Sequence, residues 1–185
     1  MTASAGAENL GGAAGQHTAR RFRILFLCTG NSARSILAEA LARARAGDVF
    51  TAHSAGSEPT GMVNRFALET LEAAGILTDG LESKNMDRFL TPDAPPIDIV
   101  VTVCDRANDR CPVFPGGTIR LHWGLPDPAR IELGEAMARA AFRETFDILA
   151  ERIERLAAHA RASGGDPATL RRRLAEEEDT LFHPL

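Results

Sequence analysis

A largely apolar segment that leads directly into a cysteine and a short polar loop constrains this chain more than any other stretch. The segment covers 22–27, and the loop occupies 28–34 and includes Gly30 and Arg34. Ser35 then opens a helical pattern of apolar residues. The pattern predicts a strand, a tight loop and the N-terminus of a helix. Successive backbone N–H groups in such a loop, together with the helix dipole, form a binding site for an anion.

The residues of this loop predict a site for a tetrahedral oxyanion beside a nucleophilic thiol. The expected anion-binding residues are Thr29, Gly30, Asn31, Ser32, Ala33 and Arg34. Arg34 can bind two oxygens of the anion through parallel hydrogen bonds. Cys28 would lie beneath the anion, where the positive field favours its thiolate, and Ser35 can donate a hydrogen bond to that thiolate. The alternative is that Cys28 is a small buried apolar residue, but the strand before it and the helix after it favour the catalytic role.

The length and local composition predict one folded domain with a segment at each end. A chain of 185 residues is long enough for one domain with a full core. Residues 1–20 are rich in Ala, Gly, Ser and Thr without periodicity, which predicts a disordered N-terminal tail. We expect the domain over 21–160 and a C-terminal helical extension over 161–185. That extension can pack on the domain, mediate an oligomer or present a solvated charged face, so the oligomeric state stays open.

Charge and cysteine content exclude several classes of protein. The net charge of −4 does not indicate a nucleic acid partner. No stretch approaches the roughly 18 apolar residues of a membrane span, and the first residues lack the basic and apolar regions of a secretory signal. The three cysteines are too few for a disulfide scaffold, and their odd number indicates a reducing compartment or thiol chemistry. We therefore expect a cytoplasmic protein without a membrane partner.

Strand and helix patterns alternate along the domain. Strands are expected at 22–27, 50–56, 98–104 and 118–123, and helices at 35–46, 64–74, 85–90, from about 128 to 160, and from 167 to about 179. Alternating strands and helices indicate an α/β fold with a doubly wound parallel sheet. The expected architecture is a single flavodoxin-like three-layer sandwich, with a four-stranded parallel sheet in the order 2-1-3-4 and helices on both faces.

This topology places two of the cysteines together. In doubly wound sheets, ligands bind beyond the carboxyl ends of the strands, at the switch point between strands one and three. Cys28 follows the first strand and Cys104 ends the third. The order 2-1-3-4 therefore predicts that both thiols lie at the same edge of the sheet, next to each other.

The third cysteine predicts a redox switch. Cys104 and Cys111 are seven residues apart, and seven helical residues span about 10.5 Å. A disulfide needs Cα atoms within about 7 Å, so a bond between these cysteines requires the segment to unwind or loop out. The segment is polar, and Pro112 prevents the helix from continuing, which makes it locally unstable. The alternative is a buried strand-end residue at Cys104 and an incidental thiol at Cys111.

An acidic residue is expected at the same edge of the sheet. Asp127 follows the fourth strand and precedes Pro128, so it can protonate a leaving oxygen or cap a helix, and both roles are compatible. Trp123 is expected in the core or the pocket wall. His53 and His122 are expected to be structural, since the sequence lacks the spacing of cysteine and histidine ligands that a zinc site requires.

These motifs together resemble one known family. Residues 28–35 (CTGNSARS), 54–56 (Ser-Ala-Gly) and 127–128 (Asp-Pro) resemble the low-molecular-weight protein tyrosine phosphatase superfamily. Cys104 and Cys111-Pro112, with His122-Trp123-Gly124 before Asp127-Pro128-Ala129, resemble its thioredoxin-coupled arsenate reductases. The resemblance covers roughly 22–158 and implies a phosphatase-like catalytic domain. It also implies a thiolate relay from Cys28 to Cys104 to Cys111 that reduces arsenate to arsenite, with Arg34 holding the anion and Asp127 assisting loss of an oxygen.

The resemblance also carries expectations about partners and leaves one alternative. It implies arsenate or phosphate as the bound oxyanion, thioredoxin or another thiol reductant as the source of electrons, and no bound cofactor. Some relatives bind potassium near the loop, at positions that match Asn31, Glu39 and Ser54; Lys84 could supply that charge here, so no metal is expected. The alternative is a phosphatase for phosphotyrosine or small phosphoesters that uses Cys28, Arg34 and Asp127, although phosphatases usually have an aromatic residue in place of Ala129.

Overall fold

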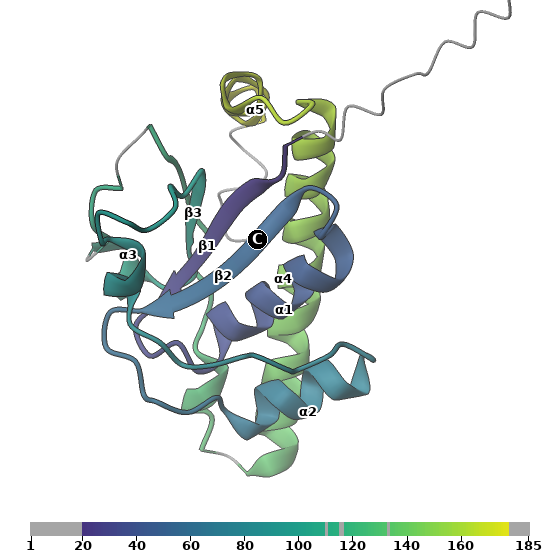
Figure 1. Cartoon of the computed structure of the whole chain (residues 1–185). Coiled ribbons are helices and arrows are strands. Elements are labelled where there is room, and N and C mark those ends of the chain that lie inside the picture. The colour runs from purple at the N-terminus through teal and green to yellow at the C-terminus, as the bar shows by residue number, and fades with distance from the viewer. Residues whose placement is uncertain (1–19, 110, 115–116, 133, 178–185) are drawn as a thin grey trace, which may run out of the picture.

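A four-stranded parallel sheet forms the centre of the computed structural model (Figure 1). Its strands are β1 (Phe22–Cys28), β2 (Phe50–Gly56), β3 (Ile99–Thr102) and β4 (Ile119–His122). They lie in the order β2-β1-β3-β4, with β1 paired in parallel to β2 and β3, and β3 to β4. This confirms the predicted fold class and strand order. The structure describes residues 20–109, 111–114, 117–132 and 134–177.

The central strand β1 is buried on both faces. Ile24, Phe26 and Cys28 belong to the larger core cluster, whereas Leu25 and Leu27 belong to a second cluster. Side chains alternate between the faces of a strand, so a strand covered on both sides must be apolar at consecutive positions. This burial explains the run of apolar residues that dominates this part of the sequence.

The two faces of the sheet are covered to different depths. The larger core cluster lies between the sheet and the helices α1 (Arg34–Ala46), α2 (Arg65–Ala73), α4 (Glu135–Ala162) and α5 (Pro167–Ala175). The smaller cluster is covered by the 3₁₀ helix η1 (Met86–Phe89) and by the chain around Phe114. The remaining helical elements are the short helix α3 (Asp105–Asp109) and the 3₁₀ helix η2 (Pro128–Arg130), which both follow strand ends.

Several predicted boundaries shift for identifiable reasons. The helix expected from about residue 128 is divided into η2 and α4, because Gly134 has φ +96°, a left-handed conformation that interrupts a right-handed helix. Strand β3 begins at Ile99 rather than at Asp98, whose carboxylate accepts hydrogen bonds from the Arg23 amide and the Arg20 guanidinium. The last helix is capped by Asp166, whose side chain accepts hydrogen bonds from the Ala168 and Thr169 amides, and it ends at Ala175 rather than near residue 179.

The C-terminal extension packs on the domain. Leu170 and Leu174 of α5 are buried in the larger core cluster, and the Arg171 guanidinium donates a hydrogen bond to the Gly117 carbonyl oxygen. Of the alternatives that the sequence leaves open, the described part of the extension therefore packs on the domain. The disordered tail predicted for 1–20 and the residues after 177 lie outside the described residues, apart from Arg20. None of the helices described here has the length and apolar character needed to cross a membrane.

His53 on β2 makes the stability of the fold sensitive to acid. Burial, followed by the charges of Arg23, Arg43 and Lys84, lowers the pKa of His53 to about 4. Between pH 6.5 and pH 4 the unfolded chain therefore binds a proton at His53 that the folded chain does not bind. The contribution of neutral His53 to the free energy of unfolding is complete above pH 6.5 and is lost as the pH falls toward 4. Wild type should lose about 1 kcal/mol more of its free energy of unfolding between pH 7 and pH 5 than His53→Gln does. The difference is no larger because His53 is partly exposed and solvent weakens the effect. Urea unfolding of both proteins at the two pH values measures this difference, and an equal loss in both would contradict it.

Candidate active site

The loop between β1 and α1 has its carbonyl groups directed away from its centre. The Thr29 carbonyl accepts a hydrogen bond from the Glu58 amide, that of Gly30 from the Thr60 amide, and that of Ser32 from the Asn64 amide. In a planar trans peptide the N–H of the following residue points opposite to the carbonyl. The outward carbonyls therefore direct the amides of Gly30, Asn31 and Ala33 inward. This is the arrangement of donors that binds an oxyanion.

Asn31 holds this loop in shape. Its φ of +43° is left-handed, which is uncommon for any residue but glycine. Its side-chain nitrogen, Nδ2, donates hydrogen bonds to the hydroxyls of Ser35 (3.0 Å) and Ser54 (2.8 Å). Its side-chain oxygen accepts a hydrogen bond from the Lys84 backbone amide at 2.8 Å. Asn31 is completely buried, so these three bonds satisfy its side chain and fix the backbone around it.

Gly56 lets β2 approach the loop closely. A Cβ atom at this position would lie only 2.5 Å from the Thr29 carbonyl oxygen and 3.0 Å from the Asn31 amide nitrogen. Any other residue would displace the loop. This contact explains the glycine of the Ser54-Ala55-Gly56 motif, while Ser54 contributes through its bond to Asn31.

Cys28 lies at the base of the loop. Its Sγ is 3.0 Å from the Asn31 amide nitrogen, which donates to it, and 2.9 Å from the Ser35 hydroxyl. Burial raises the pKa of Cys28 above its ordinary value; Ser35, the Asn31 amide and the Arg34 charge act in the opposite direction but do not outweigh it. The groups that the sequence indicates around Cys28 do favour the thiolate, but the sequence does not indicate the burial that outweighs them.

The Ser35 hydroxyl is the first of the groups that oppose this burial. We expect Ser35→Ala to raise the pKa of Cys28 further and to slow its alkylation by iodoacetamide at pH 7 by about 10-fold, because a hydrogen bond to a charged group contributes about 1.5–3 kcal/mol. Since only the thiolate reacts, alkylation of both proteins should become faster as the pH rises toward the pKa of Cys28. Alkylation of Cys28, followed by mass spectrometry from pH 6 to 10, measures it. Equal rates in both proteins across this range would contradict the role of Ser35.

Arg34 and Asp127 form the polar side of the site. The Arg34 Nη1 atom donates to the Leu125 carbonyl oxygen at 2.6 Å, and its Nη2 lies 3.1 Å from a carboxylate oxygen of Asp127. The Arg34 Nε is buried and makes no hydrogen bond to a described residue, so it remains available to an anion. Asp127 also caps η2 by accepting from the Ala129 amide, as the alternative for this residue expects.

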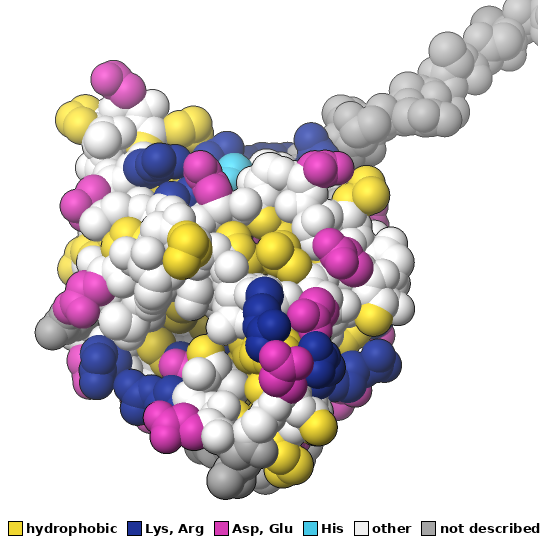
Figure 2. Space-filling view, turned by 90° about the horizontal axis from the view of Figure 1, so that it is seen from below, with side chains coloured by type: hydrophobic (Ala, Val, Ile, Leu, Met, Phe, Trp, Pro, Cys, Tyr) yellow, Lys and Arg dark blue, Asp and Glu magenta, His cyan; other side chains and the backbone are white. Residues whose placement is uncertain are grey.

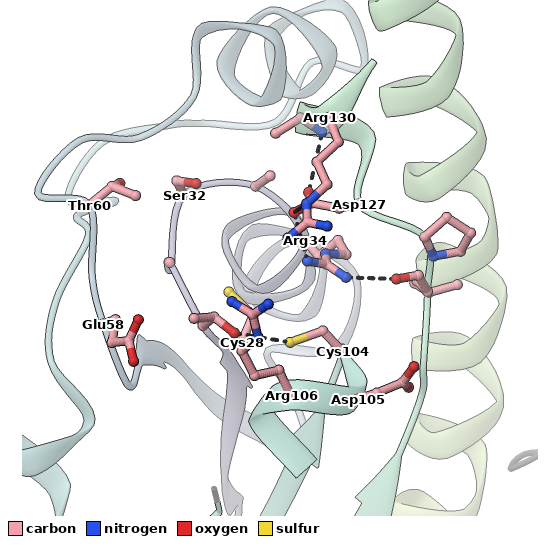
Figure 3. A pocket seen from close by; sticks show the side chains of 16 residues that line it. Cys28, Ser32, Arg34, Glu58, Thr60, Cys104, Asp105, Arg106, Asp127 and Arg130 are labelled. Carbon is pink, nitrogen blue, oxygen red and sulfur yellow. Dashed lines mark hydrogen bonds and ion pairs between the residues drawn. The ribbon is translucent and has the colours of Figure 1, made fainter. Parts of the chain in front are cut away.

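These groups line one pocket of about 640 Å³ (Figure 3). The pocket contains four residues that the sequence places in the site, Cys28, Arg34, Cys104 and Asp127, and the loop residues Thr29, Gly30, Ser32 and Ala33. Ser35 reaches the site through its contact with Cys28, and Asn31 lies buried beneath the loop. Five polar lining residues are absent from the sequence prediction: Glu58, Thr60, Asp105, Arg106 and Arg130. Figure 2 looks onto this edge of the molecule, where basic and acidic side chains lie interspersed.

Cys104 and Cys111 occupy different surroundings. Cys104 lines the pocket, and its Sγ lies 3.6 Å from the Thr29 hydroxyl. Cys111 does not line this pocket and packs against the cluster that contains Leu25 and Leu27. All three thiols are free. The structure therefore brings Cys28 and Cys104 to one pocket and leaves Cys111 outside it.

The helix that follows Cys104 makes few side-chain contacts with other described residues. It is α3, a helix of five residues of which only Ala107 is buried. Among the described residues, two side-chain contacts hold the helix, one between Asn108 and the Thr102 hydroxyl at 3.3 Å and one between Asp105 and His122 at 3.1 Å. So few contacts favour local opening of this segment.

A buried ion pair lies behind the loop. Glu39 of α1 is completely buried, and its carboxylate is 3.5 Å from the Lys84 Nζ and accepts hydrogen bonds from Ser54 and Arg43. Ser54 connects this carboxylate to Asn31 and so to the loop. The Lys84 ammonium supplies a positive charge beside Glu39. The described residues contain no group of three or more His, Cys, Asp or Glu side chains that could hold a metal ion.

Comparison with known proteins agrees with this geometry. Residues 23–166 match the family model for low molecular weight phosphotyrosine protein phosphatase. The chain is 40% identical over 134 residues to an arsenate reductase of Bacillus licheniformis; the matched region covers 72% of this chain and 94% of that protein. It is 38% identical over 134 residues to an arsenate reductase of Bacillus subtilis, with the same coverage.

Solved structures give the same result. A thioredoxin-dependent arsenate reductase of Corynebacterium glutamicum superposes with a TM-score of 0.61 and 27% identity over 77% of this chain, although this chain covers only 63% of that protein. An arsenate reductase in the phosphate binding state superposes with a TM-score of 0.58 and 27% identity, covering 74% of this chain and 97% of that one. Both the family model and the bacterial relatives thus show that the chain belongs to the low molecular weight phosphotyrosine protein phosphatase family.

Proposed function

We propose that this protein is an arsenate reductase that passes electrons from a thiol partner through Cys28, Cys104 and Cys111. The observation that carries the proposal is the second thiol in the pocket: Cys104 lies beside the oxyanion loop together with Cys28. A phosphatase needs one nucleophilic cysteine and a water molecule, whereas a reductase needs a second thiol to accept the bond from the first. The similarity to arsenate reductases over most of the chain supports the same choice.

In the first step the Cys28 thiolate attacks the arsenic atom of arsenate. The inward amides of the loop and the Arg34 guanidinium bind the oxygens and stabilise the charge that develops on them. An S–As bond forms and one oxygen leaves as water, with a proton that Asp127 can deliver. Arsenic stays in the +5 state in this step, because one oxygen ligand is exchanged for sulfur.

In the second step the Cys104 thiolate attacks the Cys28 sulfur. A Cys28–Cys104 disulfide forms, the S–As bond breaks, and its electron pair stays on arsenic, which leaves as arsenite in the +3 state. Cys111 then attacks Cys104, the disulfide moves to Cys104–Cys111, and Cys28 leaves as a thiolate. Two thiols are oxidised and one arsenic atom is reduced by two electrons, so the sequence balances.

The oxidised protein needs a dithiol to regenerate it. We propose thioredoxin as this reductant, on the basis of the similarity to a thioredoxin-dependent reductase and of a Cys111 that lies outside the pocket. Exchange between thiols and disulfides also requires a compartment that keeps thiols reduced, so we propose that the enzyme acts in the cytoplasm.

Coupled reduction of arsenate tests the function. NADPH oxidation by the protein with thioredoxin and thioredoxin reductase should depend on arsenate and should release one arsenite for each NADPH. Hydrolysis of aryl phosphates without arsenate-dependent NADPH oxidation would instead establish the phosphatase alternative that uses Cys28, Arg34 and Asp127.

Movement of α3 gives a second test of the relay. A helical spacing of seven residues would separate Cys104 and Cys111 by about 10.5 Å, too far for a disulfide. Because α3 spans five of the residues between them, we expect it to unwind when they join. Amide hydrogen exchange of the peptide that contains α3 should be at least about 10-fold faster in the oxidised protein, because local opening removes its few hydrogen bonds. The peptides of β1 and α1 serve as internal controls and should exchange equally in both forms. Equal exchange in α3 would contradict the switch.

A further inference from the structure

We propose that Arg106 is a substrate-sensing residue, which binds the arsenate anion from α3 and holds the Cys104–Cys111 segment helical until the reduced product leaves. The proposal rests on the function proposed above and assigns a role to a residue that the relay itself does not use. Arg106 lies two positions after Cys104, in the short helix that must unwind for the last thiol exchange. Its position thus connects the anion site to the helix that we expect to unwind.

The Arg106 side chain belongs to the pocket. It lines the pocket together with Cys28, Thr29, Arg34 and Cys104, and Figure 3 shows it directed toward the region of these side chains. Unlike Arg34, whose guanidinium is bound to Leu125 and Asp127, Arg106 makes no ion pair and no side-chain hydrogen bond with another described residue. The guanidinium is therefore free to bind an anion in the pocket.

The weakness of α3 makes such a bond important. The helix has one buried residue and is held by the contacts of Asn108 with Thr102 and of Asp105 with His122. A further bond from Arg106 to an anion that is held by the loop would stabilise this five-residue helix against opening, and it would matter because the helix has so few other contacts. It also keeps Cys104 close to Cys28 while the S–As intermediate still needs attack.

The charges of substrate and product give the direction of the effect. Arsenate carries negative charge at neutral pH, whereas arsenite, As(OH)₃, is uncharged. Arg106 thus binds the substrate and the oxyanion intermediate but not the product. When arsenite leaves, the bond to Arg106 is lost, α3 opens, and Cys104 can move to Cys111. The residue therefore orders the two disulfide steps and protects Cys104 from premature pairing with Cys111.

Inorganic phosphate provides a test without any redox reaction. Hydrogen exchange of the reduced protein is measured with and without phosphate, in wild type, Arg106→Gln and Arg143→Gln. Arg143 lies on α4, is exposed and pairs with Asp147, so its variant removes the same charge away from the pocket. In wild type and Arg143→Gln, saturating phosphate should slow exchange in both the loop peptide and the α3 peptide by about 3- to 10-fold, the range expected for a partly exposed charged bond.

In Arg106→Gln, protection of the loop peptide and protection of the α3 peptide should no longer occur together. Phosphate at saturation should still protect the loop peptide, whereas its protection of α3 should be lost. Phosphate should also slow the oxidation of Cys104 and Cys111 to a disulfide by diamide in wild type but not in Arg106→Gln. The role of Arg106 would be overturned if phosphate protected α3 equally in Arg106→Gln and in wild type. It would also be overturned if phosphate protected the loop but not α3 in wild type. Either result would leave the proposed function standing. No protection of the loop in wild type would overturn the oxyanion site and the proposed function with it.

Discussion

Replacing Cys104 by serine is expected to lower arsenate-dependent NADPH oxidation by at least about 10³-fold, as for other groups that act as an essential unit in a reaction. The serine hydroxyl cannot form a disulfide with Cys28, so the S–As intermediate has no thiol to attack it. Binding of the anion should survive, because the loop amides and Arg34 do not depend on the Cys104 sulfur. The coupled assay with thioredoxin and its reductase measures the loss.

Cys111→Ser provides the matched control for this prediction. That variant retains both thiols of the pocket, so each molecule should release one arsenite, form the Cys28–Cys104 disulfide and stop. Cys104→Ser should release none. Counting arsenite after a single exposure to arsenate, with mass spectrometry of the trapped species, distinguishes the two. Sustained turnover by both variants, at a rate near that of wild type, would exclude the relay.

Glu39→Gln is expected to be the most destabilising single change among those considered. Glu39 is completely buried and pairs with Lys84, whose side chain is only 8% exposed. Removing one partner of a buried ion pair leaves an uncompensated charge, which costs about 3–5 kcal/mol. The same carboxylate accepts a hydrogen bond from Ser54, which holds Asn31, so the loop should also loosen. Urea unfolding at pH 7 measures the loss of stability.

A double-mutant cycle separates the ion pair from general damage to the core. Lys84→Met combined with Glu39→Gln removes both charges and should be more stable than Glu39→Gln alone, because the buried ammonium is no longer unpaired. Alkylation of Cys28 in the same proteins reports whether the loop keeps its shape. If the double variant lost the full sum of the two single effects, the two side chains would be energetically independent.

The sequence predicts the framework of the site because strand ends converge by topology. A pattern of four strands alternating with helices is sufficient to place Cys28 and Cys104 at one edge of the sheet, and local spacing is sufficient for Arg34 and Ser35. Asp127 follows from its position after the fourth strand. The central strands β1 and β3 carry nearly continuous apolar or β-branched residues, which is the strongest local signal, and the predicted strand order is confirmed.

Other features depend on contacts between distant segments, which no local pattern records. Glu58 and Thr60 enter the site because their amides bind loop carbonyls, and their side chains show no periodicity that would mark them. The raised pKa of Cys28 depends on its burial in the folded chain rather than on residue type. Arg106 could have been identified, since a charged residue two positions after a strand-end cysteine must lie near the same edge of the sheet.

The hydrogen bonds between the loop carbonyls and the segment from Glu58 to Asn64 have a consequence for the speed of binding. A loop held from outside has already lost its conformational entropy when the protein folds. An incoming anion then meets donors that need no reorganisation, so little of its binding energy is consumed in ordering the protein. The first chemical step can thus follow diffusion without a closing motion, and slow motion is confined to the later exchange of thiols.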